Sequence, residues 1–305
     1  MSETATLGFI GLGNMGGRIS RRLVDGGFTV HGHDPKSPPP PGVTPGASAA
    51  EVARASDVVL LSLPSSRVVE AVLQGEGGLL ENAGEGTIII DLSTSEPAST
   101  RALAEEAAQR SIALLDAGIS GGAARAEQGD LTLMVGGDAA VIESLDSVFA
   151  PFATHVHRVG DSGAGHTAKL LNNFLNAIAL SATSEIMVAA RKAGLDLHVL
   201  LEVLNTSSGT NFATQSRFPK IVDGDYLKGG LSNALMMKDV LAYVGLLSDL
   251  GVASPNSAAP MAAFGSALQL GYGDAISNSV VDAIGDLSGG VRIHDAHPDT
   301  GRNSK

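Results

Sequence analysis

The chain has 305 residues, enough for two domains or one large domain, and 44% of them are hydrophobic, enough for a sizeable core. The net charge of −12 and the pI near 5.0 argue against nucleic acid and anionic membranes as partners, so a small-molecule ligand is expected. The absence of cysteine excludes disulfides, thiolate metal sites and cysteine nucleophiles, and the eight histidines lack metal-ligand spacing. The acidic N-terminus has no apolar leader segment, which predicts a cytoplasmic protein.

A glycine pattern follows the first expected strand. Thr6 to Gly11 is expected to be a short buried strand that leads into G-x-G-x-x-G and then into a helix. In this context Gly11 permits a tight turn, Gly13 lets the backbone approach a pyrophosphate, and Gly16 lets the helix pack on the strand. The alternative is a glycine-rich turn without a ligand. The candidate cofactor-binding residues are Gly11, Leu12, Gly13, Asn14, Met15 and Gly16.

An acidic residue closes the second expected strand, Phe28 to His33. Asp34 stands 23 positions after Gly11, near the spacing of about 20 at which a carboxylate binds the adenosine ribose of a dinucleotide. Such a carboxylate accepts hydrogen bonds from the ribose hydroxyls and repels a 2′-phosphate. NAD is therefore expected, and NADP is the alternative, with Lys36 as the nearby basic residue. An aspartate that only opens a turn is the other interpretation.

Two continuous apolar runs, Asp57 to Leu63 and Thr87 to Leu92, indicate parallel strands covered on both faces. The alternation of strands with helices, such as Glu96 to Gln109, predicts an α/β domain with a doubly wound Rossmann-type parallel sheet. Ligands of such sheets lie beyond the carboxyl ends of the strands, so the residues after these runs are expected to line the cofactor cleft. They are Leu63, Pro64, Ser93 and Thr94.

A glycine-containing loop is expected after the next strand, Ile112 to Leu115. In it, Ser120, Gly121 and Gly122 offer a hydroxyl group and uncovered backbone N–H groups, which suit a substrate carboxylate. A connection that binds nothing is the alternative. The rest of the expected sheet consists of strands Leu131 to Val135 and Thr154 to Val159, with a helix from Asp138 to Val148 between them.

The longest expected helix opens in the stretch from Gly163 to Asn173 and continues to Ala193. It is apolar nearly all round, and polar residues interrupt it, so a helix buried in the protein is favoured over a membrane span. Lys169, Asn172 and Asn173 project from one face. Burial and the helix dipole would lower the pKa of the Lys169 amine and let it exchange protons near neutral pH. Alternatively, Lys169 reaches solvent and the asparagines bond to a neighbouring helix.

The sequence after this helix predicts further helices only. A second lysine, in the pair Lys238-Asp239, interrupts an apolar helix and suggests either a site that faces Lys169 or an interhelical salt bridge. The expected helices are Leu197 to Leu204, Asn233 to Leu250, Pro260 to Leu270 and Asp274 to Ile284.

These patterns predict two domains. We expect an NAD(P)-binding Rossmann domain at residues 1–164 and an all-α domain at 165–305. The second domain would begin with an interdomain helix at 165–193. The polar tail from His294 to Lys305 is expected to be frayed.

Four ordered motifs carry a resemblance to a known family. They are the glycine loop Gly11 to Gly16, the loop Asp116 to Leu131, the pattern Gly163-Ala-Gly-x-x-x-Lys169-x-x-Asn172-Asn173, and the pair Lys238-Asp239. From about Thr6 to Leu287, the chain resembles the β-hydroxyacid dehydrogenases, the group of 3-hydroxyisobutyrate dehydrogenase and 2-hydroxy-3-oxopropionate reductase. The resemblance implies a 6-phosphogluconate dehydrogenase-like architecture and an NAD(P)-dependent oxidoreductase acting on a short hydroxy acid. It also implies that the all-α domain at 165–305 serves substrate binding and oligomerisation, with assembly into dimers or tetramers.

The resemblance also implies roles for individual residues. Lys169 would be the general acid and base, Asn173 would orient the substrate, and Lys238 would close over the site and contact the cofactor. The substrate-binding residues would be Ser120, Gly121, Gly122, Asn173 and Lys238.

Two positions qualify the resemblance. Family members commonly have Pro-Val where this chain has Gly118-Ile119, and the added freedom before Ser120 would reshape the substrate pocket. His166, one turn before Lys169, is expected to face solvent, and the alternative is that it contacts ligand or tunes the lysine.

Two other functions share this fold. Imine reductases look like this family but commonly carry Asp or Tyr where Lys169 stands, and non-catalytic relatives replace the lysine as well. Both stay alternatives to hydroxyacid oxidation. The expected substrates are 3-hydroxyisobutyrate, 2-hydroxy-3-oxopropionate, a small semialdehyde such as succinic semialdehyde, and a four-carbon sugar acid such as threonate.

Overall fold

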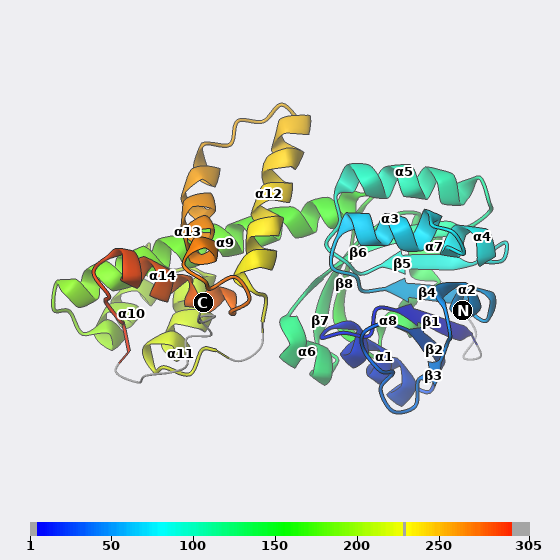
Figure 1. The fold of residues 1–305 in the computed structure, drawn as a ribbon, viewed down its shortest axis with the longest axis horizontal. Coiled ribbons are helices and arrows are strands. Elements are labelled where there is room, and N and C mark those ends of the chain that lie inside the picture. The colour runs from blue at the N-terminus through cyan, green and yellow to red at the C-terminus, as the bar shows by residue number, and fades with distance from the viewer. Residues whose placement is uncertain (1–4, 228–229, 295–305) are drawn as a thin grey trace. The chain divides into compact units, whose positions relative to one another are not determined.

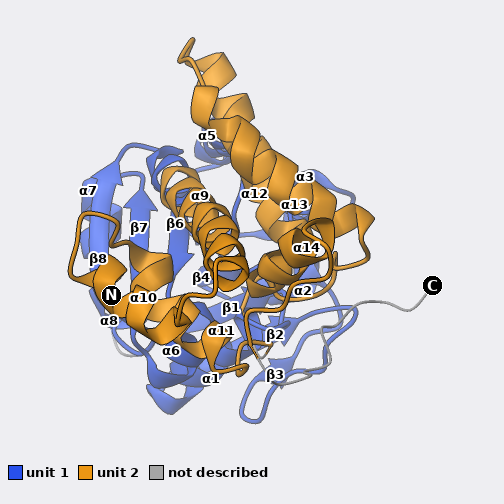
Figure 2. Ribbon diagram, turned by 90° about the vertical axis from the view of Figure 1, so that its left-hand side faces the viewer, with its two compact units in different colours: residues 1–169 blue, residues 170–305 orange. Residues whose placement is uncertain are grey.

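The computed structural model describes residues 5–227 and 230–294. The chain divides into two compact units, Met1–Lys169 and Leu170–Lys305, which Figure 2 shows in different colours. The first unit is built on one β-sheet and the second is helical (Figure 1). The division falls inside the long helix α9 (Ala164–Lys192), directly after Lys169.

The sheet of the first unit has eight strands in the order β3-β2-β1-β4-β5-β6-β7-β8. Every neighbouring pair is parallel except β6 with β7, which is antiparallel. This arrangement confirms the predicted fold class, and the short β3 is an element that the sequence did not predict. The strands are β1 (Thr6–Ile10), β2 (Thr29–His33), β3 (Thr44–Pro45), β4 (Val58–Leu61), β5 (Ile88–Asp91), β6 (Ala113–Ser120), β7 (Leu131–Gly136) and β8 (Ala153–Gly160).

Strand β6 is longer than predicted. It continues past Leu115 to Ser120, through residues that were expected to form a loop. Asp116 pairs with Gly136 and Ser120 with Thr132, so the antiparallel partner β7 supplies the ladder that extends the strand.

Four helices of the first unit, α2, α3, α4 and α6, were not located by the sequence, and the last of them directly follows β6. The single helix expected from Asp138 to Val148 is instead two short helices, and the Ser144 hydroxyl between them donates to the carbonyl of Val141. The helices are α1 (Gly16–Asp25), α2 (Ala49–Arg54), α3 (Ser66–Gln74), α4 (Leu79–Asn82), α5 (Pro97–Ala108), α6 (Gly122–Gln128), α7 (Ala139–Glu143) and α8 (Asp146–Phe149).

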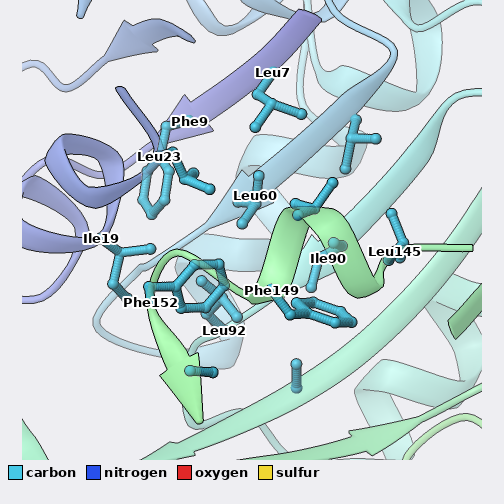
Figure 3. Close-up of a cluster of buried hydrophobic side chains, with 14 of the residues drawn as sticks. Leu7, Phe9, Ile19, Leu23, Leu60, Ile90, Leu92, Leu145, Phe149 and Phe152 are labelled. Carbon is cyan, nitrogen blue, oxygen red and sulfur yellow. The ribbon is translucent and has the colours of Figure 1, made fainter. Parts of the chain in front are cut away.

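Central strand β4 is covered on both faces, as its unbroken apolar run predicts. Leu60 belongs to the cluster shown in Figure 3, together with Phe149 and Phe152, whereas Val59 and Leu61 belong to a separate cluster. Successive side chains of a strand point to opposite faces, so the sheet has a hydrophobic layer on each side. This double burial fixes the strands whose carboxyl ends carry the predicted site.

The second unit consists of helices around α9. This helix is long and apolar enough to cross a membrane, but 56% of its most apolar window is buried, as in the core helix of a globular domain. The elements after α9 are α10 (Leu197–Asn205), a π-helical turn (Ala213–Arg217), α11 (Phe218–Val222), α12 (Asn233–Asp249), a 3₁₀ turn (Pro255–Ser257), α13 (Ala258–Gln269), a second 3₁₀ turn (Ser277–Ser279) and α14 (Val280–Leu287).

A buried polar cluster fixes the end of the described chain. The hydroxyl of Tyr226 donates to Asp282 at 2.5 Å and lies 2.9 Å from Nε2 of His294. Arg292 donates to Asp286 at 2.6 Å. The predicted fraying is therefore wrong at His294, which is only 5% exposed. Its contact with Tyr226, far away in the sequence, holds it in the interior of the second unit. Residues 295–305 of the predicted tail lie outside the described residues.

Two tyrosines of the second unit are expected to resist ionisation at alkaline pH. Burial and the charge of Asp282 raise the pKa of Tyr226, and burial and a hydrogen bond to Asp286 raise the pKa of Tyr272 to about 12. These folded pKa values lie above the unfolded value of 10.0, so the stability that both groups contribute is complete below pH 10.0 and is lost as the pH rises through the folded values.

Phenolate absorbance tests this expectation. At about pH 11 the native protein should absorb less than the denatured protein, because both tyrosines stay protonated until the chain unfolds. A Tyr272→Phe variant should show a smaller difference between the two states. Equal absorbance of native and denatured protein would contradict the prediction.

Candidate active site

The glycine loop joins β1 to α1, and each of its three glycines has a different structural role. Gly11 has a φ of +89°, and a Cβ there would collide with the carbonyl oxygen of Ser62. A Cβ on Gly16 would collide with the carbonyl oxygen of Gly11. At Gly13 no atom lies within 4 Å of a Cβ position. Packing thus requires the first and third glycines, and the second leaves open backbone at the start of α1, which fits a pyrophosphate.

The remaining residues of this loop have different surroundings. Leu12 is 4% exposed and Met15 packs against the hydrophobic core, so these two offer a ligand their backbone. Asn14 is exposed and accepts a hydrogen bond from Arg18 at 2.6 Å. Arg18 also pairs with Glu127 of α6 at 2.8 Å, which ties the glycine loop to the helix that follows β6.

Asp34 lies directly after β2, and three backbone N–H groups donate to its carboxylate. The donors are Leu12 at 2.7 Å, Lys36 at 2.7 Å and Ser37 at 3.0 Å. Partial burial opposes the charged form, but the hydrogen bonds outweigh it and hold the pKa of Asp34 below its usual value. A fixed negative charge therefore stands beside the glycine loop, where the predicted ribose site requires it.

The loops after β4 and β5 contact one another. The backbone N–H of Leu63 donates to the hydroxyl of Ser93 at 2.9 Å, and Ser93 is 4% exposed. Pro64 is exposed and Thr94 is partly exposed. The Ser93 side chain therefore holds the two loops together, while the neighbouring residues present their surface at this edge of the sheet.

The predicted substrate residues lie at the end of β6. Ser120 is the last residue of the strand, and Gly122 opens α6. Gly121 and Gly122 have φ values of +133° and +70° and are exposed, and no atom lies within 4 Å of a Cβ position on Gly122. Their backbone is accessible at the same edge of the sheet as the glycine loop.

Lys169 lies in the second turn of α9, and the glycines around it let this helix approach the sheet. A Cβ on Gly165 would collide with backbone oxygens of β6 and β7. A Cβ on Gly118 would stand 2.5 Å from Cβ and 3.1 Å from Cγ of Lys169. The stem of Lys169 therefore lies against β6, at a strand position two residues before Ser120.

Comparison with known proteins gives the family. Residues 6–160 match the family model of the NAD binding domain of 6-phosphogluconate dehydrogenase. Residues 163–284 match a second family model, described as NAD-binding of NADP-dependent 3-hydroxyisobutyrate dehydrogenase. It is 37% identical to the 2-(hydroxymethyl)glutarate dehydrogenase of Eubacterium barkeri over 246 residues, 79% of this chain and 81% of the relative. The chain belongs to the β-hydroxyacid dehydrogenase family.

Other members of the family support this assignment. The NAD-dependent L-serine dehydrogenase of Pseudomonas aeruginosa is 36% identical over 263 residues, covering 82% of this chain and 87% of the relative. The solved 3-hydroxyisobutyrate dehydrogenase of Mycobacterium tuberculosis with L-serine is 30% identical, with a TM-score of 0.82 and coverage of 93% and 99% of the two chains. The predicted family and NAD(P) cofactor are thereby confirmed.

Imine reductases share the fold at lower identity. The Myxococcus stipitatus enzyme is 18% identical, with a TM-score of 0.62 and coverage of 92% of this chain and 99% of that chain. This likeness concerns the fold alone.

The second unit of this hydroxyacid dehydrogenase holds Asn173 and Lys238 around a buried carboxylate. Asp239 of α12 is 2% exposed and accepts a hydrogen bond from the Asn173 amide of α9 at 2.6 Å. Its other oxygen lies 3.1 Å from Nζ of Lys238. This salt bridge is therefore between neighbours in sequence, and a hydrogen bond from Asn173 links α9 to α12.

Two buried polar residues close to the predicted site were misplaced by the sequence analysis. His166 was expected to face solvent, but its side chain is fully buried and hydrogen-bonds to Thr100 of α5 at 2.7 Å. Asp116 was expected to begin a loop, but it is fully buried in β6 and caps α9. A polar residue inside an apolar segment was the available signal in both cases. Their partners lie tens of positions away in the sequence.

Proposed function

We propose that this protein transfers a hydride between NAD(P) and a short β-hydroxy acid, with Lys169 as general acid and base. The observation that carries the proposal is the position of Lys169 against β6, near Ser120, in the unit that also holds the glycine loop and Asp34. Family membership supports the reaction class, since the named relatives are hydroxyacid dehydrogenases.

The chemistry of these relatives' substrates narrows the proposal. By their names they act on 2-(hydroxymethyl)glutarate, serine and 3-hydroxyisobutyrate. All three acids carry a primary alcohol on the carbon next to the carbon that bears the carboxylate. We propose a substrate of this class, or the semialdehyde that its oxidation yields.

Each residue has a role in this mechanism. NAD supplies a hydride acceptor at nicotinamide C4 when it is bound. Neutral Lys169 takes the proton of the substrate hydroxyl during oxidation, and the ammonium form returns it during reduction. We assign the substrate carboxylate to the hydroxyl of Ser120 and the N–H groups of Gly121 and Gly122. We assign orientation of the substrate to Asn173, and closure over substrate and cofactor to Lys238.

A spectrophotometric panel tests the function. Nicotinamide absorbance would be followed with NAD and NADP separately, against short 2- and 3-hydroxy acids, their semialdehydes and cyclic imines. Turnover of a 3-hydroxy acid supports the proposal. Turnover of imines alone would refute the proposal in favour of imine reduction. Tight cofactor binding with no turnover of any compound would refute it in favour of a non-catalytic role.

We propose NAD as the preferred cofactor, and Asp34 provides the test. Asp34→Ala removes a carboxylate whose hydrogen bonds to ribose hydroxyls are charge-assisted, so KM for NAD should rise by about tenfold to a hundredfold. The penalty for NADP should fall, because the charge that opposes a 2′-phosphate is gone. The measurement is kcat/KM with each cofactor.

Asp25→Ala is the matched control for this prediction. Asp25 is another acid of the first unit, exposed and paired with Arg21 at 2.9 Å within α1. Its loss should leave the ratio of kcat/KM for NAD and NADP unchanged. An unchanged ratio in Asp34→Ala as well would remove Asp34 from cofactor selection.

We also propose a cytoplasmic homodimer or homotetramer that binds neither nucleic acid nor membranes. Leu171, Leu175 and Ile186 of α9 are exposed by 44%, 67% and 49%. At about 100° per residue these side chains lie within a stripe about 60° wide, and an exposed apolar stripe favours a protein partner. The net charge of −12 opposes phosphate-rich surfaces. Light scattering after size exclusion tests the assembly, and a monomer at micromolar concentration would refute it.

A further inference from the structure

A buried polar cluster lies where β5, β6 and α5 meet the first turn of α9, all within the first unit. Its four titratable or hydroxyl side chains are nearly inaccessible to solvent, with Asp116 and His166 at 0% exposure and Asp91 and Thr100 at 2%. Burying such groups is costly unless they are paired, so the cluster has a structural or functional reason. None of these residues has a role in the mechanism described above.

Asp116 holds the start of α9. One carboxylate oxygen accepts the backbone N–H of Gly163 at 2.7 Å, and the other accepts that of His166 at 2.7 Å. The first N–H groups of a helix have no partner within the helix, and a negative charge there is stabilised by the helix dipole. The first turn of α9 is thereby attached to β6.

His166 holds the same turn from the other side. Its Nδ1 is 2.7 Å from the hydroxyl of Thr100, and its Nε2 is 3.3 Å from the carbonyl oxygen of Asp91. The carboxylate of Asp91 also accepts the backbone N–H of Ser93 and the hydroxyl of Ser95, both at 2.9 Å. The cluster therefore joins α9 to the loop after β5, which is predicted to line the cofactor cleft.

We propose that Asp116 and His166 are positioning residues for Lys169. Lys169 is three residues beyond His166 on one helix, and its stem contacts β6 at Gly118, two residues beyond Asp116 on one strand. The cluster thus fixes both the helix that carries the amine and the strand against which the amine lies. This inference rests on the proposed function, because it takes Lys169 as the proton carrier.

Asp116→Asn tests the proposal. The amide keeps one acceptor oxygen but turns an NH₂ group towards the second N–H of α9, so the first turn loses one of its two attachments. A displacement of about 1 Å at a reacting group costs about a hundredfold in rate. We expect kcat, normalised to sites titrated with NADH, to fall by about tenfold to a hundredfold, while KM for the hydroxy acid and Kd for NADH change by less than about twofold.

Asp138→Asn is the matched control. Asp138 caps α7 in the same unit through the same chemistry, accepting N–H groups of Ala140 and Val141 at 2.8 and 3.1 Å. Asp138 is exposed at its helix end, and asparagine caps a helix about as well as aspartate, so this variant should stay stable and keep wild-type kcat. Equal kcat in both variants, or equal losses of kcat in both, would overturn a positioning role.

Two further measurements keep the proposal testable if Asp116→Asn does not fold. Thr100→Val removes the partner of His166 Nδ1 and should lower kcat by about threefold to tenfold with KM unchanged. Amide hydrogen exchange should quicken at residues 163–169 in that variant and not in the Asp138 control. Wild-type kcat together with wild-type exchange in Thr100→Val would overturn the proposal.

Failure of the inference is distinguishable from failure of the proposed function. If Lys169→Ala keeps its turnover, the proposed function loses its proton carrier whatever Asp116 does. If Lys169→Ala loses turnover while Asp116→Asn and Thr100→Val keep it, the function stands and the positioning role is refuted.

Discussion

Replacement of Lys169 by alanine is expected to lower kcat for the hydroxy acid by about 10²- to 10⁴-fold, the range that a positioned general acid or base contributes. The expected cause is loss of the only proton acceptor that the proposal places at the substrate hydroxyl. Binding of NADH should be nearly unchanged, because the glycine loop and Asp34 lie on other elements. The measurements are steady-state kcat and a fluorescence titration with NADH.

Lys192→Ala is the control for this experiment. Lys192 is the last residue of the same helix, and its amine donates to the carbonyl of Ser288 at 3.1 Å. This variant should keep wild-type kcat, because it removes an amine from α9 without touching the first unit. Near-native turnover of Lys169→Ala would exclude Lys169 from the chemistry.

A single methyl group at Gly118 is expected to disturb the reaction almost as strongly. In Gly118→Ala the new Cβ would stand 2.5 Å from Cβ of Lys169, 3.1 Å from its Cγ and 3.2 Å from the carbonyl oxygen of Gly165. The stem of Lys169 near the backbone cannot swing aside as a chain end can, so the helix or the strand must move. We expect kcat to fall by about a hundredfold, the cost of a displacement of about 1 Å.

Gly84→Ala separates this effect from the general cost of replacing a glycine. Gly84 lies in the same unit, and the nearest atom to a Cβ there is the Thr87 hydroxyl at 3.9 Å. This variant should have wild-type kcat, and both variants should bind NADH with wild-type affinity. Wild-type turnover of Gly118→Ala would mean that the contact with Lys169 adjusts freely.

The Gly118 contact lies at the position where the chain departs from the family pattern. Family members commonly carry proline at this position, and a ring there would occupy the space that the Lys169 stem fills in this chain. The sequence suggested added backbone freedom before Ser120. In the structure, the stem of Lys169 occupies the space beside Gly118.

Most of the fold followed from local patterns. The apolar runs placed the parallel strands because a strand buried on both faces needs them, and the glycine pattern marked the turn into α1. Strand β6 was predicted to end too early, at Leu115, because residues 116–120 have the composition of a loop. What makes them a strand is the antiparallel ladder with β7, a pairing that composition does not reveal.

Candidate site residues could be predicted where they belong to one sequence motif. They could not be predicted where residues distant in the sequence come into contact only in the folded chain. Lys169 and Asn173 stood out because polar residues interrupt an apolar helix. His166 was misplaced because its burial depends on Thr100 and Asp91, which are 66 and 75 positions away. The same reason applies to His294, whose partner Tyr226 is 68 positions away.

The distribution of aromatic residues gives the two units separate optical signals. The chain has no tryptophan, and its three tyrosines, at positions 226, 243 and 272, all belong to the second unit. Tyrosine emission therefore reports the unfolding of the helical unit alone. Fluorescence of bound NADH would report the first unit, which holds the proposed cofactor site. A denaturant titration read at both signals would thus resolve whether the units unfold together or in sequence, with no label attached to the protein.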